Sequence, residues 1–547
     1  MIKVSFNGGE KREYRDGVTY YDISKDCHLK YPILGVKINN EVIALSKEAK
    51  TEQILEFFDV TDINGYMIYK SAIKMIFELA LKREFVDLGI SYDHSVPKGM
   101  LGTVMGSYTL TEQDIDKIRL AMDQIIHDNI LFKKLSVRKK DAIKYYEKIG
   151  QFEKSSNVGA ISDQTITMYQ LDNLLNYYYN DMPYSTGAID KYEFEYIGNN
   201  KIVFLWPDRK SGGKISEYAP SENIVKAYDE GKTWLRSLNM SYISNLNKII
   251  SKSGIRDFMN SSEIVFNLNV AKIAQSIISM PEKKFILIAG PSSSGKTTTC
   301  KRLSEYLAAM GINPIKISTD DYFVDRELTP KDEFGNYDFE CLENVDVKLL
   351  NQHIIRLLNH EKVTLPRFNF ITGKREQSNT IIELKENSII LIEGLHCLND
   401  ALLPAVSKNL KYKIYLSPFI PLNIDRHNYI STIDLRLIRR IVRDNRDRGS
   451  DVSATIKSWQ VVRNGEEKYI FPFIEQADVI LNTALAYELG VLKVYVEPLL
   501  HSVGIESPYY EEAKRLLNFL KQFFPIPGDY VNSTSILREF IGGRAND

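Results

Sequence analysis

Hydrophobic and polar residues alternate at the start of this 547-residue chain, where polar residues separate Ile2, Val4 and Phe6. Such a period of two predicts short strands with one buried face. Segment 35–43 repeats the alternation around an Asn-Asn pair, which favours a tight turn between two further strands. We therefore expect a small, mostly β domain over residues 1–62.

A helical spacing replaces this alternation in the next part of the chain. Apolar residues three and four positions apart over residues 66–83 predict a long helix. A second helix is expected to begin at Thr111, because Asp114 completes a capping-box pattern. Alternation returns over residues 150–215, so segment 63–215 is predicted to be an α+β domain.

The second half of the chain follows a stretch rich in Pro, Gly and Ser, residues 207–220, which is typical of a linker. Residues 216–280 have a helical pattern and are expected to form a connector. Over residues 281–485, strand-like and helix-like segments alternate, which predicts a parallel sheet flanked by helices. Residues 486–547 are expected to form a C-terminal helical extension. The predicted fold class is therefore an α/β multidomain protein.

Composition narrows the classes of partner. The formal net charge of −1 disfavours nucleic acid or an anionic membrane surface as the main partner. The four cysteines are far apart and form no C-x-x-C pair, which is typical of a reducing compartment. No apolar run approaches the ~18 residues of a membrane span. These features predict a cytoplasmic protein without membrane contact, and they leave a homo-oligomer open.

The strongest motif is the octapeptide GPSSSGKT at residues 290–297, which fits G-x-x-x-x-G-K-[ST]. An apolar run over 285–289 leads into it and a helical pattern over 298–308 follows. Successive backbone N–H groups of such a loop cradle phosphate oxygens. Lys296 adds positive charge for the β- and γ-phosphates, and the Thr297 hydroxyl can bind Mg²⁺. We expect ATP, or alternatively GTP, together with Mg²⁺. The residues expected to contact the nucleotide are Gly290, Pro291, Ser292, Ser293, Ser294, Gly295, Lys296, Thr297 and Thr298.

Two further predicted strands end in carboxylates. The strand over 314–318 leads to Asp320 and Asp321, and the strand over 389–392 ends at Glu393. Because the carboxyl ends of parallel strands meet at one edge of a sheet, these groups can reach the metal and the acceptor hydroxyl.

An arginine-rich stretch follows at residues 436–448. For a P-loop kinase, it favours a helix and loop that close over the phosphates. A solvated helix, with Asp444 and Asp447 as internal partners, is the other interpretation. The arginines are Arg436, Arg439, Arg440, Arg443, Arg446 and Arg448.

Segment 281–485 resembles the uridine kinase / phosphoribulokinase family, with the family's motifs in the same order. The motif that carries the catalytic aspartate corresponds to residues 318–323, which assigns the base to Asp320 and leaves Asp321 as the alternative. The motif that holds the ribose hydroxyls corresponds to residues 337–340.

The remaining motifs of this family correspond to residues 366–375, Glu393-Gly394 and residues 439–449. The resemblance implies Asp320, Lys296, Arg443 and Arg448 as catalytic residues, Thr297, Asp320 and Glu393 as metal ligands, and Glu340, Phe368 and Arg440 as substrate contacts.

Departures from the family cluster where the base would be read. The family's base-reading His falls on Gly373, an Arg falls on Ser450, and a Gln falls on Ser458. The aromatic platform is Phe368, which has no hydroxyl. Because a site that loses hydrogen-bond donors loses discrimination, we expect a relaxed or changed base preference.

The N-terminal half, about residues 1–215, resembles the first two domains of threonyl-tRNA synthetase, a TGS β-grasp domain (residues 1–62) and an editing domain (residues 63–215). That family's H-x-x-x-H metal-binding pair falls on Lys70 and Lys74. Since a protonated lysine is a poor metal ligand, the resemblance implies a structural or ligand-sensing module without editing chemistry.

We therefore expect an ATP-dependent kinase that phosphorylates a ribose 5′-hydroxyl, with uridine or cytidine as the acceptor. Asp320 would accept the hydroxyl proton. One alternative is a phosphoribulokinase-like kinase of another small alcohol, for which Arg367 and Lys374 would add basic charge. Another is a nucleotide-dependent RNA- or translation-associated binding protein.

Overall fold

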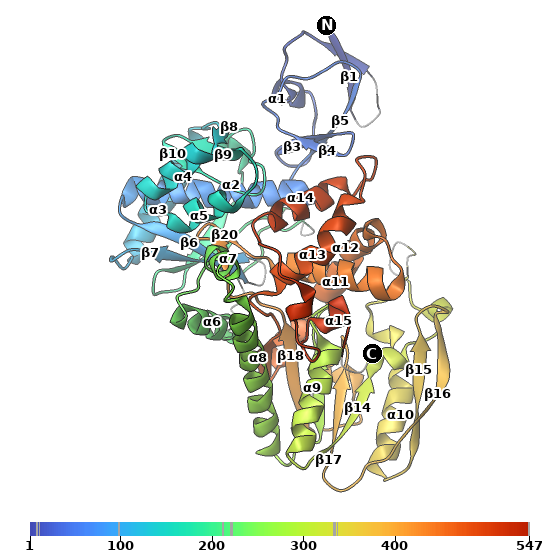
Figure 1. Cartoon of the computed structure of the whole chain (residues 1–547). Helices are drawn as coiled ribbons and strands as arrows, with labels where there is room; N and C mark the ends of the chain where they lie inside the picture. Colours follow the sequence, from blue (N-terminus) through green and yellow to red (C-terminus); the bar gives the residue numbers. More distant parts are fainter. Residues whose placement is uncertain are drawn as a thin grey trace.

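The computed structural model describes residues 1–6, 9, 11–96, 99–209, 213–218, 222–331, 335 and 337–544. Parts of the predicted linker over residues 207–220 lie outside these residues. An N-terminal sheet lies at one end of the molecule and the P-loop sheet at the other, with a second α/β unit beside them (Figure 1).

The N-terminal unit is a five-stranded mixed sheet in the order β2-β1-β5-β3-β4. Its central strands β1 and β5 are parallel, and β3 and β4 meet at a turn where Asn39 and Asn40 have positive φ. Val4, Ile23 and Leu55 belong to a separate small core. The elements are β1 (Ile2–Phe6), β2 (Lys11–Tyr14), α1 (Tyr20–Ser24), β3 (Gly35–Ile38), β4 (Glu41–Ile43) and β5 (Gln53–Phe58).

The second unit packs two helices against a four-stranded sheet in the order β11-β12-β7-β6. The predicted capping box is confirmed at the start of α3, where Thr111 and Asp114 bond reciprocally. The basic residues Lys133, Lys134 and Arg138 lie on a strand, β8. The elements are α2 (Ile63–Glu84), β6 (Gly89–Val96), β7 (Gly99–Met105), α3 (Glu112–His127), β8 (Lys133–Arg138), α4 (Lys139–Lys148), α5 (Phe152–Ala160), β9 (Thr165–Leu171), β10 (Leu174–Asn176), β11 (Glu193–Tyr196) and β12 (Lys201–Leu205).

The P-loop sheet has five parallel strands in the order β14-β17-β13-β18-β21, as the alternation of strands and helices predicted. The first strand in sequence, β13, lies in the middle, so the chain order reverses beside it and leaves a crevice at the strand ends. The elements are β13 (Phe285–Ala289), α9 (Lys296–Ala309), β14 (Asn313–Ser318), α10 (Val347–Leu358), β17 (Ser388–Glu393), β18 (Lys411–Ser417), α11 (Thr432–Arg448), α12 (Val452–Tyr469) and β21 (Val479–Asn482).

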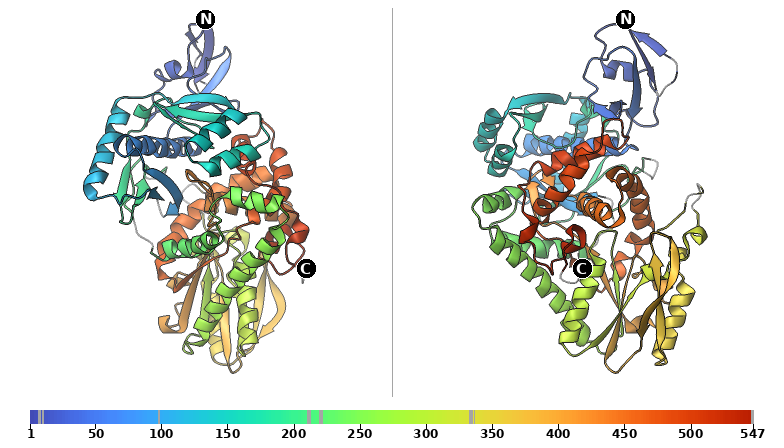
Figure 2. Two further views of the ribbon diagram at one scale, coloured as in Figure 1. Left: turned by 60° about the vertical axis from the view of Figure 1, so that its left-hand side comes forward. Right: turned by 45° about the vertical axis from the view of Figure 1, so that its right-hand side comes forward.

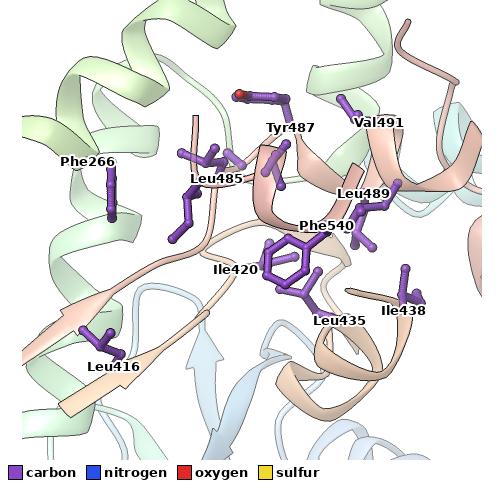
Figure 3. Packing of buried hydrophobic residues seen from close by; sticks show 14 of the residues in the cluster. Phe266, Leu416, Ile420, Leu435, Ile438, Leu485, Tyr487, Leu489, Val491 and Phe540 are labelled. Carbon is purple, nitrogen blue, oxygen red and sulfur yellow. The ribbon is translucent and has the colours of Figure 1, made fainter. Parts of the chain in front are cut away.

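Helices cover both faces of this sheet (Figure 2). Ile286 and Ile288 face a core that they share with α8 and α9, whereas Phe285 and Leu287 face α6 and α10. Helices from the predicted connector and the predicted C-terminal extension share the first core, in which Phe540 packs beside Leu435 (Figure 3). The additional helices are α6 (Glu222–Ser237), α7 (Ile243–Ser251), α8 (Ile255–Ile278), α13 (Glu488–His501), α14 (Tyr510–Leu520) and α15 (Arg538–Ile541).

Two hairpins extend from the P-loop unit. β15 (Val363–Asn369) and β16 (Lys374–Ile382) form a ribbon at its outer edge. β19 (Asn423–Asp425) and β20 (Asn428–Tyr429) form a short hairpin that reaches into the second unit, where the Tyr92 amide donates to the Arg426 carbonyl at 2.7 Å. Among the described residues, no helix has the length and apolar character needed to cross a membrane.

Two lysines of α2, Lys70 and Lys74, hold this second hairpin. Lys74 Nζ donates to the His427 carbonyl at 3.1 Å, and Lys70 Nζ contacts the Tyr429 hydroxyl. Burial lowers the pKa of Lys74 to about 7. The His427 ring is buried among the side chains of Lys154 and Asn176. The hairpin of the P-loop unit therefore fills this part of the second unit.

Candidate active site at the P-loop

The P-loop connects the fully buried strand β13 to α9, as the sequence predicted. Its first glycine permits close packing, because a Cβ on Gly290 would lie 2.7 Å from the Leu416 carbonyl oxygen. Gly295 has φ of +86°, in the left-handed region that favours glycine. Lys296 Nζ donates to the carbonyls of Gly290 at 2.9 Å and Pro291 at 3.3 Å, so its ammonium group lies against the loop.

Two of the six arginines are buried and donate hydrogen bonds to backbone carbonyls of the P-loop. Arg436 donates to the Ser292 carbonyl at 3.3 Å, and Arg439 donates to the Ser293 carbonyl at 3.2 Å. Both side chains are almost completely buried, with 2% and 0% exposure. Arg436 and Arg439 therefore fit neither interpretation of the sequence, since they are not on a solvated helix face and do not close over the phosphates. Their guanidinium groups fix the backbone of the loop.

Glu466 on α12 completes this support, and the sequence analysis missed it. Its carboxylate pairs with the Arg436 guanidinium and accepts from the Ser292 amide at 3.2 Å. Arg463 donates to the same carboxylate at 3.0 Å. The acid follows Gly465 in the last turn of α12, with no recognisable motif, so only its tertiary contacts identify it.

The remaining arginines of α11 lie on the open side of the loop. Arg440 donates to the Ser292 hydroxyl at 2.9 Å, and Arg443 donates to Asp444 at 2.8 Å. The Arg448 guanidinium lies 3.6 Å from Asp444 and 5.6 Å from the ring centre of Phe370. Asp444 thus holds these arginines together beside the P-loop.

The strand register brings the predicted carboxylates to one edge of the sheet. Glu393 is paired in register with Ile288 of β13 on one side and with Ser318 of β14 on the other. Its carboxylate accepts from the Ser318 hydroxyl at 2.9 Å and from the Thr297 hydroxyl at 3.4 Å. Burial, reinforced by the negative charge of Asp320, raises the pKa of Glu393 to about 7.

Asp320 follows β14 at this same edge. Burial raises its pKa, and the positive charges of Lys296, Arg448 and Arg443 act in the opposite direction. The four catalytic residues expected from the sequence are therefore brought together. Asp321 instead accepts a hydrogen bond from the Phe368 amide at 3.3 Å, so it fixes the end of β15, next to the hairpin turn, to the end of β14.

Hard oxygen ligands suited to Mg²⁺ lie beside the P-loop. Thr297 supplies a hydroxyl, and Glu393 and Asp320 supply carboxylates whose negative charges repel each other. Among the described residues, no group of three or more His, Cys, Asp and Glu side chains is arranged to hold a metal ion. Mg²⁺ binds through one or two carboxylates plus water and substrate phosphates, so Thr297, Glu393 and Asp320 are the residues suited to it.

Glu340 lies across from the P-loop against α12. Its Cβ would be only 2.3 Å from a Cβ on Gly465, so the helix must have glycine there. Burial raises the pKa of Glu340 to about 7, Glu466 adds to that rise, and Arg440 counters it. The predicted substrate contacts Glu340 and Arg440 are thus close enough for their charges to interact.

The third predicted substrate contact, Phe368, belongs to an aromatic cluster. Its ring lies edge-on to Phe323 at 5.6 Å and to Phe370 at 5.2 Å. Gly373, at the family's base-reading position, has φ of +69°, and a Cβ there would lie 2.8 Å from Arg326 Nε. The Arg326 guanidinium therefore covers the place that a histidine side chain would need.

Comparisons with known proteins match the part of the chain that carries this site. The model of the phosphoribulokinase / uridine kinase family matches residues 285–487. A uridine kinase of Anoxybacillus flavithermus is 30% identical over 213 residues, which are 38% of this chain and 91% of that protein. A uridine kinase of Bacillus pumilus is 28% identical over 214 residues, again 38% of this chain and 91% of that protein. A solved structure described as a possible uridine kinase from Bacillus stearothermophilus has 21% identity and a TM-score of 0.27, and the likeness covers 39% of this chain and 97% of that one. Through residues 285–487, the chain belongs to the phosphoribulokinase / uridine kinase family.

Proposed function

We propose that this protein is a nucleoside kinase, which transfers the γ-phosphate of ATP to the ribose 5′-hydroxyl of uridine or cytidine. One observation carries the proposal: the buried Asp320 follows β14 at the P-loop edge of the sheet, where the positive charges of Lys296, Arg448 and Arg443 act on its carboxylate. A carboxylate beside three cations at a phosphate cradle can receive a hydroxyl proton while the cations stabilise charge on the transferred group.

The choice of Asp320 over Asp321 as the base rests on their partners. Asp321 accepts a backbone hydrogen bond from Phe368 and holds the ribbon in place. Asp320 is buried where the positive charges of Lys296, Arg448 and Arg443 act on it, and a carboxylate there can accept the hydroxyl proton. Asp320 is therefore the proposed general base, and Asp321 is a positioning residue.

Mg²⁺ would be held by Thr297, Glu393 and Asp320, directly or through water. When bound, it would neutralise charge on the β- and γ-phosphates of the nucleotide. Lys296 would bind the β- and γ-phosphates, and the backbone amides over residues 290–298 would bind the α- and β-phosphates. GTP remains the alternative donor, because these contacts do not involve the base.

The acceptor would lie between Glu340, Arg440 and the aromatic cluster. Glu340 and Arg440 would hold the ribose hydroxyls, and Phe368 would stack on the base. Since Arg326 covers Gly373 and serines stand at positions 450 and 458, we expect weaker discrimination between pyrimidines than a hydrogen-bonded site would give.

Phosphorylation of a sugar phosphate is the weaker candidate. It would need basic groups in the acceptor pocket, and Arg367 and Lys374 are the residues expected for that role. Arg367 and Lys374 are both exposed. Arg367 also precedes the buried Phe368 on strand β15, so the side chains of Arg367 and Phe368 point to opposite faces of the ribbon. Their placement favours a neutral acceptor.

For the N-terminal half, we propose a structural module related to the TGS and editing domains of threonyl-tRNA synthetase. Its mixed sheet is the observation that supports this relation, and the contacts of Lys70 and Lys74 with the kinase hairpin support the structural role. Because both lysines contact the kinase hairpin, RNA binding at that surface is disfavoured. Salt-dependent binding of tRNA to the full chain would revive the RNA-associated alternative.

The test is nucleotide turnover by the full chain against a panel of nucleosides and sugar phosphates. We expect turnover with uridine or cytidine, and a loss of at least ~100-fold in Asp320→Asn, as for removal of a general base. Asp321→Asn is the matched control and should retain most of the turnover at saturating acceptor. Turnover only with sugar phosphates would refute the nucleoside assignment, and equal loss in both variants would refute the choice of base.

A further inference from the structure

The C-terminal segment, residues 532–544, lies directly against the P-loop, and we call it the C-terminal strap. Leu537 and Phe540 are fully buried in the core that α11 and α13 also form (Figure 3). Ile536 touches the loop itself, because a Cβ on Gly295 would lie 2.5 Å from its Cδ1. Arg302 of α9 donates to the Thr534 carbonyl. The strap is therefore an integral part of the P-loop surroundings.

Its position puts a carboxylate at the start of α9. Glu539 accepts from the Thr298 amide at 3.3 Å and from the Thr298 hydroxyl at 2.5 Å. Thr298 is the third residue of α9, so its amide is one of those without a partner inside the helix. Such amides at a helix N-terminus, after a P-loop, are donors for phosphate oxygens.

Arginines of α11 and of the strap hold the segment that carries this carboxylate. Arg446 of α11 donates to the Glu539 carbonyl at 3.2 Å, and Arg538 donates to the Gly542 carbonyl at 3.2 Å. The Arg544 guanidinium lies 3.7 Å from the Glu539 carboxylate and 3.3 Å from the Thr298 hydroxyl. Only 11% of the Glu539 side chain is exposed.

We propose that Glu539 is an internal competitor of the nucleotide: its carboxylate takes the Thr298 donors that a phosphate group of the nucleotide requires. The proposal rests on triphosphate binding at the P-loop. Two anions at one pair of donors repel each other, particularly in a partly buried place. Nucleotide binding therefore requires the Glu539 carboxylate to leave Thr298.

The buried anchors indicate how this exchange occurs. Since Leu537 and Phe540 stay in the core, the strap remains docked and only the Glu539 side chain rotates. Arg544 lies beside the same hydroxyl, so its positive charge is in place to meet the incoming phosphate. The strap thereby lowers the affinity of the P-loop without blocking it.

The test is calorimetric titration of the full-length protein with ADP and with ATP. We expect Glu539→Gln and Glu539→Ala to lower Kd about tenfold for both nucleotides, because both carry the α-phosphate and the competing charge is gone. Glu282→Gln is the matched control. That residue is exposed at the opposite end of β13, and its variant should bind as wild type does.

Unchanged or weaker binding by both Glu539 variants, with unaltered melting temperatures, would overturn the proposal. Binding by the variants but not by the wild type would support it. Binding by none of the proteins would refute both this proposal and the kinase function. Tighter binding without phosphorylation of any acceptor would leave this proposal standing and refute the kinase function. In crystals of the ADP complex, Glu539 should lie beyond hydrogen-bond distance of Thr298; a retained contact would contradict the exchange.

Discussion

The Arg436 guanidinium and the Glu466 carboxylate form a buried, two-pronged ion pair directly beneath the P-loop. Arg436 also donates to the Ser292 carbonyl, and Glu466 accepts from the Ser292 amide. One ion pair therefore holds both backbone groups of a residue in the phosphate cradle. Catalysis by phosphoryl transfer depends on such positioning more than on covalent chemistry.

Glu466→Gln should destabilise the protein by about 3 kcal/mol, because it leaves the Arg436 charge buried without its counter-ion. Nucleotide affinity should fall as well, since the Arg436 guanidinium that fixes the Ser292 carbonyl loses its charged partner. Urea unfolding and nucleotide titration measure the two effects. Glu467→Gln removes the same charge at the next, exposed residue and should change stability by less than about 0.5 kcal/mol. Equal effects of the two substitutions would contradict the supporting role.

Gly465→Ala should impair acceptor binding while sparing the nucleotide. The new Cβ would lie 2.3 Å from the Glu340 Cβ, so Glu340 must move out of the acceptor pocket. We expect the acceptor KM to rise about tenfold, the order of effect that a small misplacement causes, with the nucleotide Kd unchanged. Gly159→Ala is the control: it lies in α5 with open space around it, and it should stabilise the helix by up to about 1 kcal/mol. An unaltered acceptor KM in Gly465→Ala would show that Glu340 does not contact the acceptor.

The sequence predicted those site residues that belong to a recognisable local pattern. Glycine spacing, a buried strand and the strand-end positions of Asp320 and Glu393 suffice, because parallel strands carry their carboxyl ends to one edge. Glu466 and Glu539 could not be found in this way. They reach the P-loop from helices that come about 170 and 240 residues later in the chain, and only packing of the whole core sets their positions.

The same limit applies to the N-terminal half. The sequence indicated that Lys70 cannot serve as a metal ligand, but gave no sign that it contacts Tyr429 of the P-loop unit. The short hairpin around His427 has no motif of its own. A contact between residues more than 350 positions apart depends on how the units dock. The spacing of hydrophobic residues predicts only local secondary structure and not this docking.

Glu340→Gln should stabilise the protein above pH 7. Burial raises the pKa of Glu340 to about 7, above the ~4.3 of an unfolded chain. Below pH ~4 the carboxyl is protonated in both states and costs nothing, whereas above pH 7 the folded state must hold a buried charge. The wild type therefore loses stability between these values relative to the variant, by about 3 kcal/mol at pH 8. Chemical denaturation at pH 4.5 and pH 8 tests this. A difference between wild type and variant that does not grow with pH would show that Glu340 is not buried as described.

His427→Ala should weaken the docking of the P-loop unit onto the second unit. The His427 ring is 1% exposed, and its Nδ1 lies 2.7 Å from Lys154 Nζ and 2.9 Å from Asn176 Nδ2. Burial and the nearby lysines lower its pKa well below the usual value, so the neutral ring accepts at Nδ1. Its removal leaves the buried Lys154 ammonium with one acceptor fewer, which should cost about 2–3 kcal/mol.

This loss lies at the junction between units, so it should separate the unfolding of the second unit from that of the P-loop unit in differential scanning calorimetry. Kinase turnover should stay close to that of the wild type, because His427 lies outside the phosphate site. His501→Ala makes the same change at the exposed end of α13 and should leave the unfolding profile unaltered. A single transition at the wild-type temperature in His427→Ala would mean that the hairpin contributes little to the docking.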